Sequence, residues 1–324
     1  MTFKEIENKL SNIEKLRERF CKDRNLPVKI FISPYFESRL KLVVDENGFS
    51  DEYVRYEKFI NMVYNRFGNA EEYFAYYNKI KDDAINFIKA TDGYNKFNQE
   101  DMNKFRIQNI GFPAKDIYKA TNNGKRFISI DMGKANFSAL KRYDSSIVGN
   151  TNSYEEFISM FVADIEHLKA SKYIRQVIFG NCNPGRTTTY EKYLMDTVLT
   201  KILEVVKKDD VVFFATDEIV IDVSMYEQSD LDNLYKLIIK ETSKFSFPLK
   251  VSMFNLSKLN GVDGYVKHNI DGTREIKGVN SVDYPFVARA LLGQDVCEDD
   301  AVFVSDGRLA KLLDVPIVSL SEEL

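Results

Sequence analysis

Two short apolar runs that carry acidic residues constrain this chain more than any other feature. The first, F-I-S-I-D-M-G at 127–133, predicts a buried strand with Asp131 near its end. The second, V-V-F-F-A-T-D-E-I-V-I-D-V at 211–223, predicts a strand-like segment with Asp217 and Glu218 in its middle. Burying a carboxylate is costly unless cations or hydrogen-bond donors compensate for the lost water. Packing alone would not require this cost in folding free energy, so we take the two runs as the candidate site.

Composition limits the class of protein. The 324 residues are 44% hydrophobic, which is enough for a large core and favours two lobes over one. A net charge of -4 argues against a generally basic nucleic-acid coat protein but permits a locally basic groove. Cys21, Cys182 and Cys297 are widely spaced, so we expect neither a disulfide framework nor a structural zinc site. No apolar run approaches the roughly 18 residues of a membrane span. We therefore expect a cytoplasmic protein with no membrane partner.

Missing motifs exclude several chemistries. Histidine occurs only at His167 and His268, so histidine-based acid–base chemistry and a His-rich metal site are not expected. The sequence contains neither G-x-x-x-x-G-K-[ST] nor G-x-G-x-x-G, which excludes a P-loop NTPase and a dinucleotide enzyme. Any nucleotide would be bound by metal ions and basic side chains.

Apolar periodicity predicts an α+β chain with a mainly helical N-terminal lobe, and the polar, turn-rich connector at 91–126 predicts a lobe boundary that divides the chain into 1–120 and 121–324. Predicted helices cover 2–20, two segments within 51–89 that break near Gly68, a capped helix at 153–171, a helix with the stripe Tyr190, Tyr193, Leu194, Val198 and Ile202, and further helices at 229–244, 285–292 and 307–313. Predicted strands cover 28–36 and 249–254, and Asp271-Gly272 predicts the turn of a hairpin within 265–280.

Two acids on neighbouring strands, with basic residues between them in the chain, suit phosphoryl transfer with two Mg²⁺ (or Mn²⁺) ions. Asp131 and Asp217 would bridge both ions, with Glu218 beside them, and the backbone carbonyl of Met132 would add an oxygen ligand. A structural interpretation stays open, in which Asp131 caps the following helix and Asp217 pairs with a lysine.

The order of these features resembles motifs A, B and C of palm-domain polymerases. The segment F-F-A-T-D-E-I-V-I-D-V is similar to the H-D-E strand of the A family and to the T-D-S strand of the B family. In K-Y-I-R-Q-V-I-F-G-N, 172–181, the pair Phe179-Gly180 resembles the Y-G of the second motif. The segment 264–279 is similar to the lysine-containing hairpin with which B-family enzymes hold the primer end. The resemblance covers about 125–280, and the first 120 residues resemble no proofreading exonuclease.

The resemblance implies a palm-like antiparallel sheet with packed helices and a Mg²⁺-dependent, template-directed nucleotidyltransferase. It implies as partners a nucleic-acid primer–template, nucleoside triphosphates, and replication or transcription proteins. The implied residues are the catalytic acids Asp131, Asp217 and Glu218; the substrate-binding Lys172, Arg175, Arg186, Asn136 and Phe137; and the nucleic-acid-binding Lys267, His268, Arg274 and Lys277.

The sugar site depends on two adjacent residues. In the families resembled, the residue five places after the first Asp packs near the ribose 2′ position, which here is Asn136. A short Asn can hydrogen-bond a 2′-OH and should weaken discrimination against ribonucleotides. A one-residue shift of the turn would instead place the ring of Phe137 there and restore a steric block.

Two other functions start from the same residues. I-D-M-G-K-A-N-F also resembles the first strand of RNase H-like resolvases and nucleases, which need further acids late in the chain; the candidates are Asp283, Asp299 and Asp300. A third interpretation is a non-catalytic nucleic-acid-binding subunit of the replication machinery, which would use the basic hairpin for contact.

Overall fold

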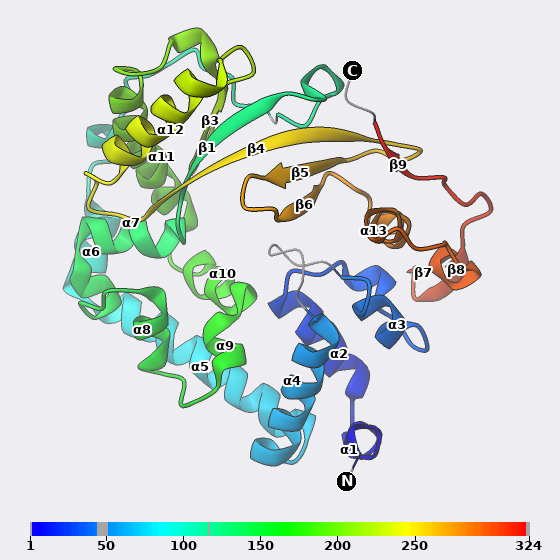
Figure 1. Ribbon diagram of the computed structural model, residues 1–324. Coiled ribbons are helices and arrows are strands. Elements are labelled where there is room, and N and C mark those ends of the chain that lie inside the picture. Colours follow the sequence, from blue (N-terminus) through cyan, green and yellow to red (C-terminus); the bar gives the residue numbers. More distant parts are fainter. Residues whose placement is uncertain (1, 44–50, 116, 322–324) are drawn as a thin grey trace. The chain divides into compact units, whose positions relative to one another are not determined.

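The computed structural model describes residues 2–43, 51–115 and 117–321, and these form an α+β protein with a mainly helical N-terminal region (Figure 1). The chain divides into two compact units. The first unit contains Met1–Ile80, Ile165–Arg175 and Ser257–Leu324, and the second contains Lys81–Asp164 and Gln176–Leu256. Residues 120 and 121, between which the sequence predicts a lobe boundary, both lie in the second unit.

The second unit holds the strands predicted to carry the acids. Its helices are the C-terminal part of α5 (Ala70–Ala90), α6 (Asp92–Gln99), α7 (Ala135–Tyr143), α8 (Tyr154–Ser159), the C-terminal part of α10 (Lys172–Gly180), α11 (Pro184–Ile202) and α12 (Gln228–Thr242). Short 3-10 turns are η2 (Met102–Phe105), η3 (Ala120–Asn122), η4 (Ser145–Val148) and η5 (Lys208–Asp210). Its strands are β1 (Arg126–Met132), β2 (Val211–Phe214), β3 (Glu218–Asp222) and the first part of β4 (Leu249–Asn260).

The strands of the second unit pair antiparallel, with β1 between β3 and β4 and with β2 outside β3. Successive residues of a strand point to opposite faces, so alternate residues of β1 and β3 share a face. One face consists of fully buried isoleucines: Ile128, Ile130, Ile219 and Ile221. Helix α11 lies against β3 and against α12 (Figure 1). This buried face anchors the strands, while the opposite face carries the acids.

The first unit combines helices with the C-terminal strands. Its helices are α1 (Phe3–Lys9), α2 (Ile13–Asp23), α3 (Phe36–Leu40), α4 (Glu52–Phe67), the N-terminal part of α5, α9 (Glu166–Ala170), the N-terminal part of α10, and α13 (Tyr284–Leu292). The 3-10 turns are η1 (Val28–Ile30) and η6 (Glu298–Ala301). Its strands are the end of β4, β5 (Tyr265–Asn269), β6 (Arg274–Lys277), β7 (Val302–Ser305), β8 (Arg308–Lys311) and β9 (Ser319–Leu320). Strand β5 pairs with β6, β7 with β8, and β9 with the end of β4.

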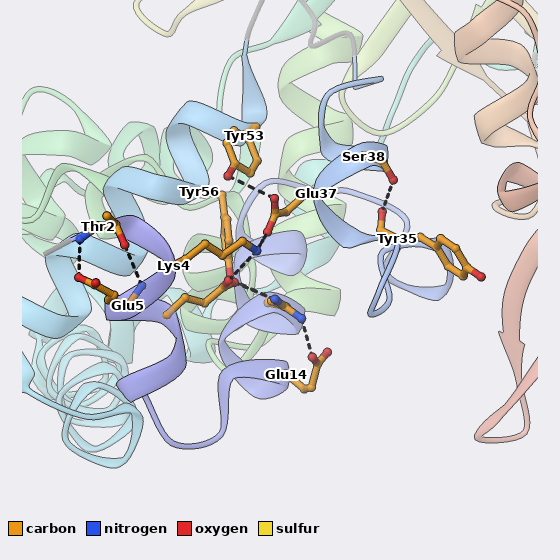
Figure 2. Close-up of polar contacts among 11 residues, drawn as sticks. Thr2, Lys4, Glu5, Glu14, Tyr35, Glu37, Ser38, Tyr53 and Tyr56 are labelled. Carbon is orange, nitrogen blue, oxygen red and sulfur yellow. Dashed lines mark hydrogen bonds and ion pairs between the residues drawn. The ribbon is translucent and has the colours of Figure 1, made fainter.

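A buried ionic cluster ties α1, α2 and α4 together in the first unit. The hydroxyl of Tyr56 donates to Oε1 of Glu7 at 2.6 Å, and the guanidinium of Arg17 donates to the same oxygen at 2.8 Å. Burial alone would raise the pKa of Glu7, but these two donors outweigh it and lower the pKa. Figure 2 shows Lys4 between this cluster and Glu37, with which it forms an ion pair. The cluster is satisfied internally, so it serves the fold.

The predicted strand at 28–36 is wrong. The chain forms a 3-10 turn at Val28–Ile30 and then the short helix at Phe36–Leu40. Pro27 and Pro34 lack the backbone N–H that a ladder needs, so the apolar side chains here are buried without joining a sheet.

The predicted helix at 307–313 is also wrong. The segment forms β8, which pairs with β7 through a turn in which Asp306 and Gly307 both have positive φ. So short a segment holds little more than one helical turn, and the tight hairpin gives its backbone groups partners at once.

The predicted helix at 153–171 is two helices, α8 and α9, and the division between the two units falls between them. The predicted cap is confirmed, because the Ser153 hydroxyl accepts the N–H of Glu156 at 3.2 Å. The predicted helix at 2–20 is also two helices, because α1 ends at Lys9 and α2 begins at Ile13 after Asn12, whose φ is 55°. The remaining predicted helices and the 265–280 hairpin are confirmed. In the described part of the chain, no helix is both long and apolar enough to cross a membrane.

Candidate functional site

Two carboxylates face each other across adjacent strands of the second unit. The antiparallel register of β1 and β3 places Asp131 directly opposite Glu218. The N–H of Met132 donates to the carbonyl of Asp217 at 2.8 Å. The neighbouring Asp131–Glu218 pair is therefore a non-hydrogen-bonded pair, in which the Cα atoms lie about 4.5 Å apart and the side chains are close. Like charges in this arrangement repel, so the fold bears an electrostatic cost here.

Side chains on the same face complete the surroundings of this pair. Lys250 of β4 lies opposite Asp131 on the other side of β1, which gives the row Lys250, Asp131, Glu218 across three strands. Ser129 precedes Asp131 by two residues, and its hydroxyl donates to Oε1 of Glu218 at 2.5 Å. Asp131 and Glu218 are half-buried, and Lys250 is exposed. The face thus offers two carboxylates and one ammonium group in a single row.

Asp217 lies in a turn. The segment 211–223, predicted as one strand with buried acids in its middle, folds as the β2–β3 hairpin, so that prediction was wrong. The N–H of Ala215 donates to the carbonyl of Glu218 at 3.0 Å, which closes the turn and leaves Asp217 exposed. Because consecutive residues point in opposite directions, Glu218 shares the face of Asp131 and Asp217 does not.

A fourth acid, Glu191 of α11, was missed by the sequence analysis. Its side chain is 4% exposed, and its Oε1 has no hydrogen-bond partner among the described residues. Burial, and then the negative charge of Asp217, raise the pKa of Glu191 to about 7. The signal was present in the sequence, since Glu191 falls between Tyr190 and Leu194 in the apolar stripe of its helix, where a charged residue is out of place. A carboxyl group that is half-protonated near neutral pH therefore lies beside the hairpin turn.

The carboxylates suit a hard divalent cation. Within residues 2–43, 51–115 and 117–321, no group of three or more His, Cys, Asp or Glu side chains lies close enough to hold a metal ion. The Asp131–Glu218 pair fits Mg²⁺ nevertheless, because this ion is usually held by one or two carboxylates while water and substrate phosphates fill its other positions. Met132, whose carbonyl is a predicted ligand, ends β1 beside this pair.

The two residues of the predicted sugar site have different surroundings. Phe137 is 4% exposed, and its ring contacts those of Tyr154, Phe157 and Phe179 at centroid distances of 6.2 to 6.3 Å. Asn136 is half-buried at the start of α7. The ring of Phe137 therefore belongs to the core, and its role as a gate for the sugar stays a prediction.

The basic residues of the predicted second motif belong to different units. Lys172 and Arg175 belong to the first unit, and Arg186 belongs to the second. The guanidinium of Arg186 donates to the carbonyl of Phe97 at 2.9 and 3.1 Å and also to that of Glu100. These bonds fix the end of α6 to α11 and use donors that a triphosphate would need, so binding of triphosphate by Arg186 stays a prediction.

The predicted nucleic-acid-binding residues share the β5–β6 hairpin of the first unit. Lys267 lies opposite Glu275, and His268 lies opposite Arg274, on alternate faces. Lys277 donates to Glu275 at 2.7 Å, and the Lys267 ammonium lies 3.7 Å from the same carboxylate. Burial alone would raise the pKa of Glu275, but the two lysines outweigh it and bring the pKa to about 2.

The late acids considered for a nuclease lie in the first unit, whereas Asp131 lies in the second. Asp300 forms an ion pair with Arg289 and accepts the N–H of Cys297 at 2.9 Å. Asp283 is the residue before α13, and burial followed by the charge of Asp263 raises its pKa. Comparisons of the chain with protein-family models, curated proteins and solved structures give no match.

Proposed function

We propose that the second unit carries out divalent-metal-dependent nucleotidyl transfer, adding a nucleotide from a triphosphate to the end of a nucleic-acid strand. The observation that supports this most is the facing pair Asp131 and Glu218 on the antiparallel sheet. Opposed carboxylates repel each other and lower the stability of the metal-free protein. A divalent cation held by both carboxylates would offset this repulsion. The order of motifs along the chain, from Asp131 to the β2–β3 hairpin, supports the same reaction class.

The residues of this face would have distinct tasks. Asp131 and Glu218 would hold Mg²⁺ or Mn²⁺, which when bound would neutralise phosphate charge and lower the pKa of the attacking hydroxyl. The Ser129 hydroxyl holds one oxygen of Glu218 and so fixes the carboxylate's orientation. Lys250, beside Asp131, is placed to attract a phosphate oxygen. Asp217, in the exposed turn, would approach the substrate from the hairpin.

Primer extension in Mg²⁺ or Mn²⁺ tests this proposal. Asp131→Asn and Glu218→Gln should each lower the rate at least about 100-fold, which corresponds to about 2.7 kcal/mol of transition-state stabilisation. Asp222→Asn is the matched control, because Asp222 lies on the same strand and face as Glu218 but forms an ion pair with Lys125 at 2.7 Å. The control should keep activity.

Other outcomes would favour other functions. Extension that survives Asp131→Asn would refute the carboxylate site. Cleavage of nucleic acid in Mg²⁺ without added nucleotide, lost in Asp131→Asn, would favour the nuclease interpretation. Strand binding with neither reaction would favour the non-catalytic interpretation. The thiols of Cys21, Cys182 and Cys297 are all free, which suits the reducing cytoplasm as the place of action.

A further inference from the structure

A cavity of about 420 Å³ lies wholly within the first unit and is rich in basic side chains. It is bordered by the end of α2, by α4, by the start of α10, by β6 and by the start of α13. Its basic lining residues are Arg24, Arg55, Lys172, Arg274 and Lys277. The volume is in the range of cavities that hold small organic ligands. Segments far apart in the sequence thus bring cationic groups to one place.

The acids that border this cavity already have partners. Glu52 accepts two hydrogen bonds from the guanidinium of Arg24, at 2.6 and 2.9 Å. Asp23 accepts the hydroxyl of Ser171 at 2.6 Å and lies 3.1 Å from Nε2 of His167. These hydrogen bonds occupy carboxylate oxygens, and the lining still has five basic side chains against three acidic ones.

The third acid, Glu275, is held by lysines. It lies 2.7 Å from the ammonium of Lys277 and 3.7 Å from that of Lys267, and its pKa of about 2 keeps it ionised. The negative charge of Glu275 is therefore offset by two lysines of the same hairpin.

Two cations remain without a carboxylate partner among the described residues. Lys172 is exposed and forms no ion pair. Arg274 donates through one nitrogen to the carbonyl of Leu291 at 3.2 Å and keeps its other N–H groups for a ligand. Strand β6, which carries Arg274, is the last of the described strands in its sheet after β5, and all four of its residues line the cavity. An anion in the cavity would find a guanidinium fork and an ammonium group.

We propose that this cavity binds the phosphate group of a nucleotide, with Lys172 and Arg274 as its ligands. A guanidinium fork and an ammonium charge together match a phosphate better than they match a single carboxylate. The cavity is larger than a phosphate ion, and its lining includes Leu26, Pro27 and Tyr284, against which a sugar or base can pack. Burial raises the pKa of Tyr284 to about 12, so its hydroxyl stays a hydrogen-bond donor. The residues of this site all belong to the first unit, whereas the carboxylate pair belongs to the second.

Calorimetry that measures the binding of pyrophosphate to the full chain tests the proposal. Wild type should bind pyrophosphate, and the variant with both Lys172→Ala and Arg274→Ala should bind at least about tenfold more weakly. Lys236→Ala, at an exposed position in the second unit, is the matched control and should bind like wild type. Arg274→Lys keeps the charge but loses the fork, so its affinity should fall between those of wild type and Arg274→Ala. Failure of wild type to bind, or equal binding by the double variant, would overturn the proposal.

Two further arms make the result clear. Because Lys172 is exposed, Lys172→Glu keeps the test valid if loss of the Arg274 contact unfolds the protein; its affinity should also fall at least about tenfold. Asp131→Asn should bind pyrophosphate like wild type, which separates this site from the proposed transfer reaction. Two single strands that differ only in a 5′-phosphate or a 5′-hydroxyl show which molecule carries the bound phosphate group. Stronger binding of the phosphorylated strand assigns the site to a strand end. Equal binding of the two strands assigns it to free nucleotides.

Discussion

The buried acid Glu191 gives a quantitative prediction about stability. The pKa of this side chain is raised from its ordinary value of 4.5 to about 7, first by burial and then by Asp217. Below about pH 4.5 the side chain is protonated in both the folded and the unfolded chain. As the pH rises, the unfolded chain loses this proton first, so the folded state loses stability until the pH passes about 7. The difference between 4.5 and about 7, at about 1.36 kcal/mol for each pH unit, gives about 3 kcal/mol.

Glu191→Gln removes this penalty, because Gln resembles the protonated acid at every pH. We expect the free energy of unfolding of the variant, relative to wild type, to increase by up to about 3 kcal/mol between pH 4.5 and pH 8.5. Any constant cost of placing an amide at this site cancels in that comparison. Urea unfolding at both pH values, in EDTA to exclude divalent cations, measures it.

The control is Glu204→Gln, which removes an exposed carboxylate that pairs with Lys201 at 2.7 Å. Exposed pairs contribute at most about 1 kcal/mol, so this variant should show little pH dependence. A relative stability of Glu191→Gln that is equal at the two pH values would refute the reasoning, because Glu191 would then be ionised normally in the folded protein.

Three further predictions test separate parts of the fold by urea unfolding. The pKa of Glu275 is lowered to about 2, so the ionised side chain stabilises the folded state above about pH 4.5, and this stabilisation is lost as the pH falls through 2. Glu275→Gln should therefore lower the free energy of unfolding by up to about 3 kcal/mol at pH 7, and by less at pH 3. Gly261→Ala should be more destabilising than Gly272→Ala, because both have φ near +83° but only at Gly261 would the new Cβ meet a backbone oxygen, at 2.0 Å. Phe137→Ala should lower stability by about 3 kcal/mol or more, and Asn136→Ala by under about 1 kcal/mol; equal losses would contradict the packing described for the Phe137 ring.

Local signals explain why much of the fold could be predicted from the sequence. Helix α4 ends at Gly68, which adopts φ of 76°, and that glycine marks the break in the sequence as well. The β5–β6 turn contains Gly272 with φ of 84°, as the Asp-Gly pair predicts. Short apolar segments were predicted less well, since 28–36 and 307–313 carry patterns that fit either element. Their structure is decided by proline and by pairing partners distant in the chain.

The candidate site was only partly accessible from the sequence. Asp131 at the end of a strand follows from the local pattern, but its partner depends on strand register, which no local pattern gives. The sequence predicts both Asp217 and Glu218 as site residues, and the position of the turn decides which of the two lies opposite Asp131. The place of Glu191 in the apolar stripe of its helix is visible in the sequence, but the depth of its burial depends on how α11 packs. Side-chain direction and burial are tertiary properties.

The distribution of charge within each unit supports a binding role for both proposed sites, the carboxylate pair and the basic cavity. In the second unit, a fold selected for stability alone would oppose Asp131 with a cation on both sides, as Lys250 does on one side. A second acid, Glu218, takes the other side, where it accepts a hydrogen bond from the neutral hydroxyl of Ser129. In the first unit the reverse holds, because basic side chains outnumber acidic ones at the cavity and two of them, Lys172 and Arg274, have no carboxylate partner among the described residues. Each arrangement gives up local stability, and each would recover it by binding an ion of the opposite charge, which is the property expected of a binding site.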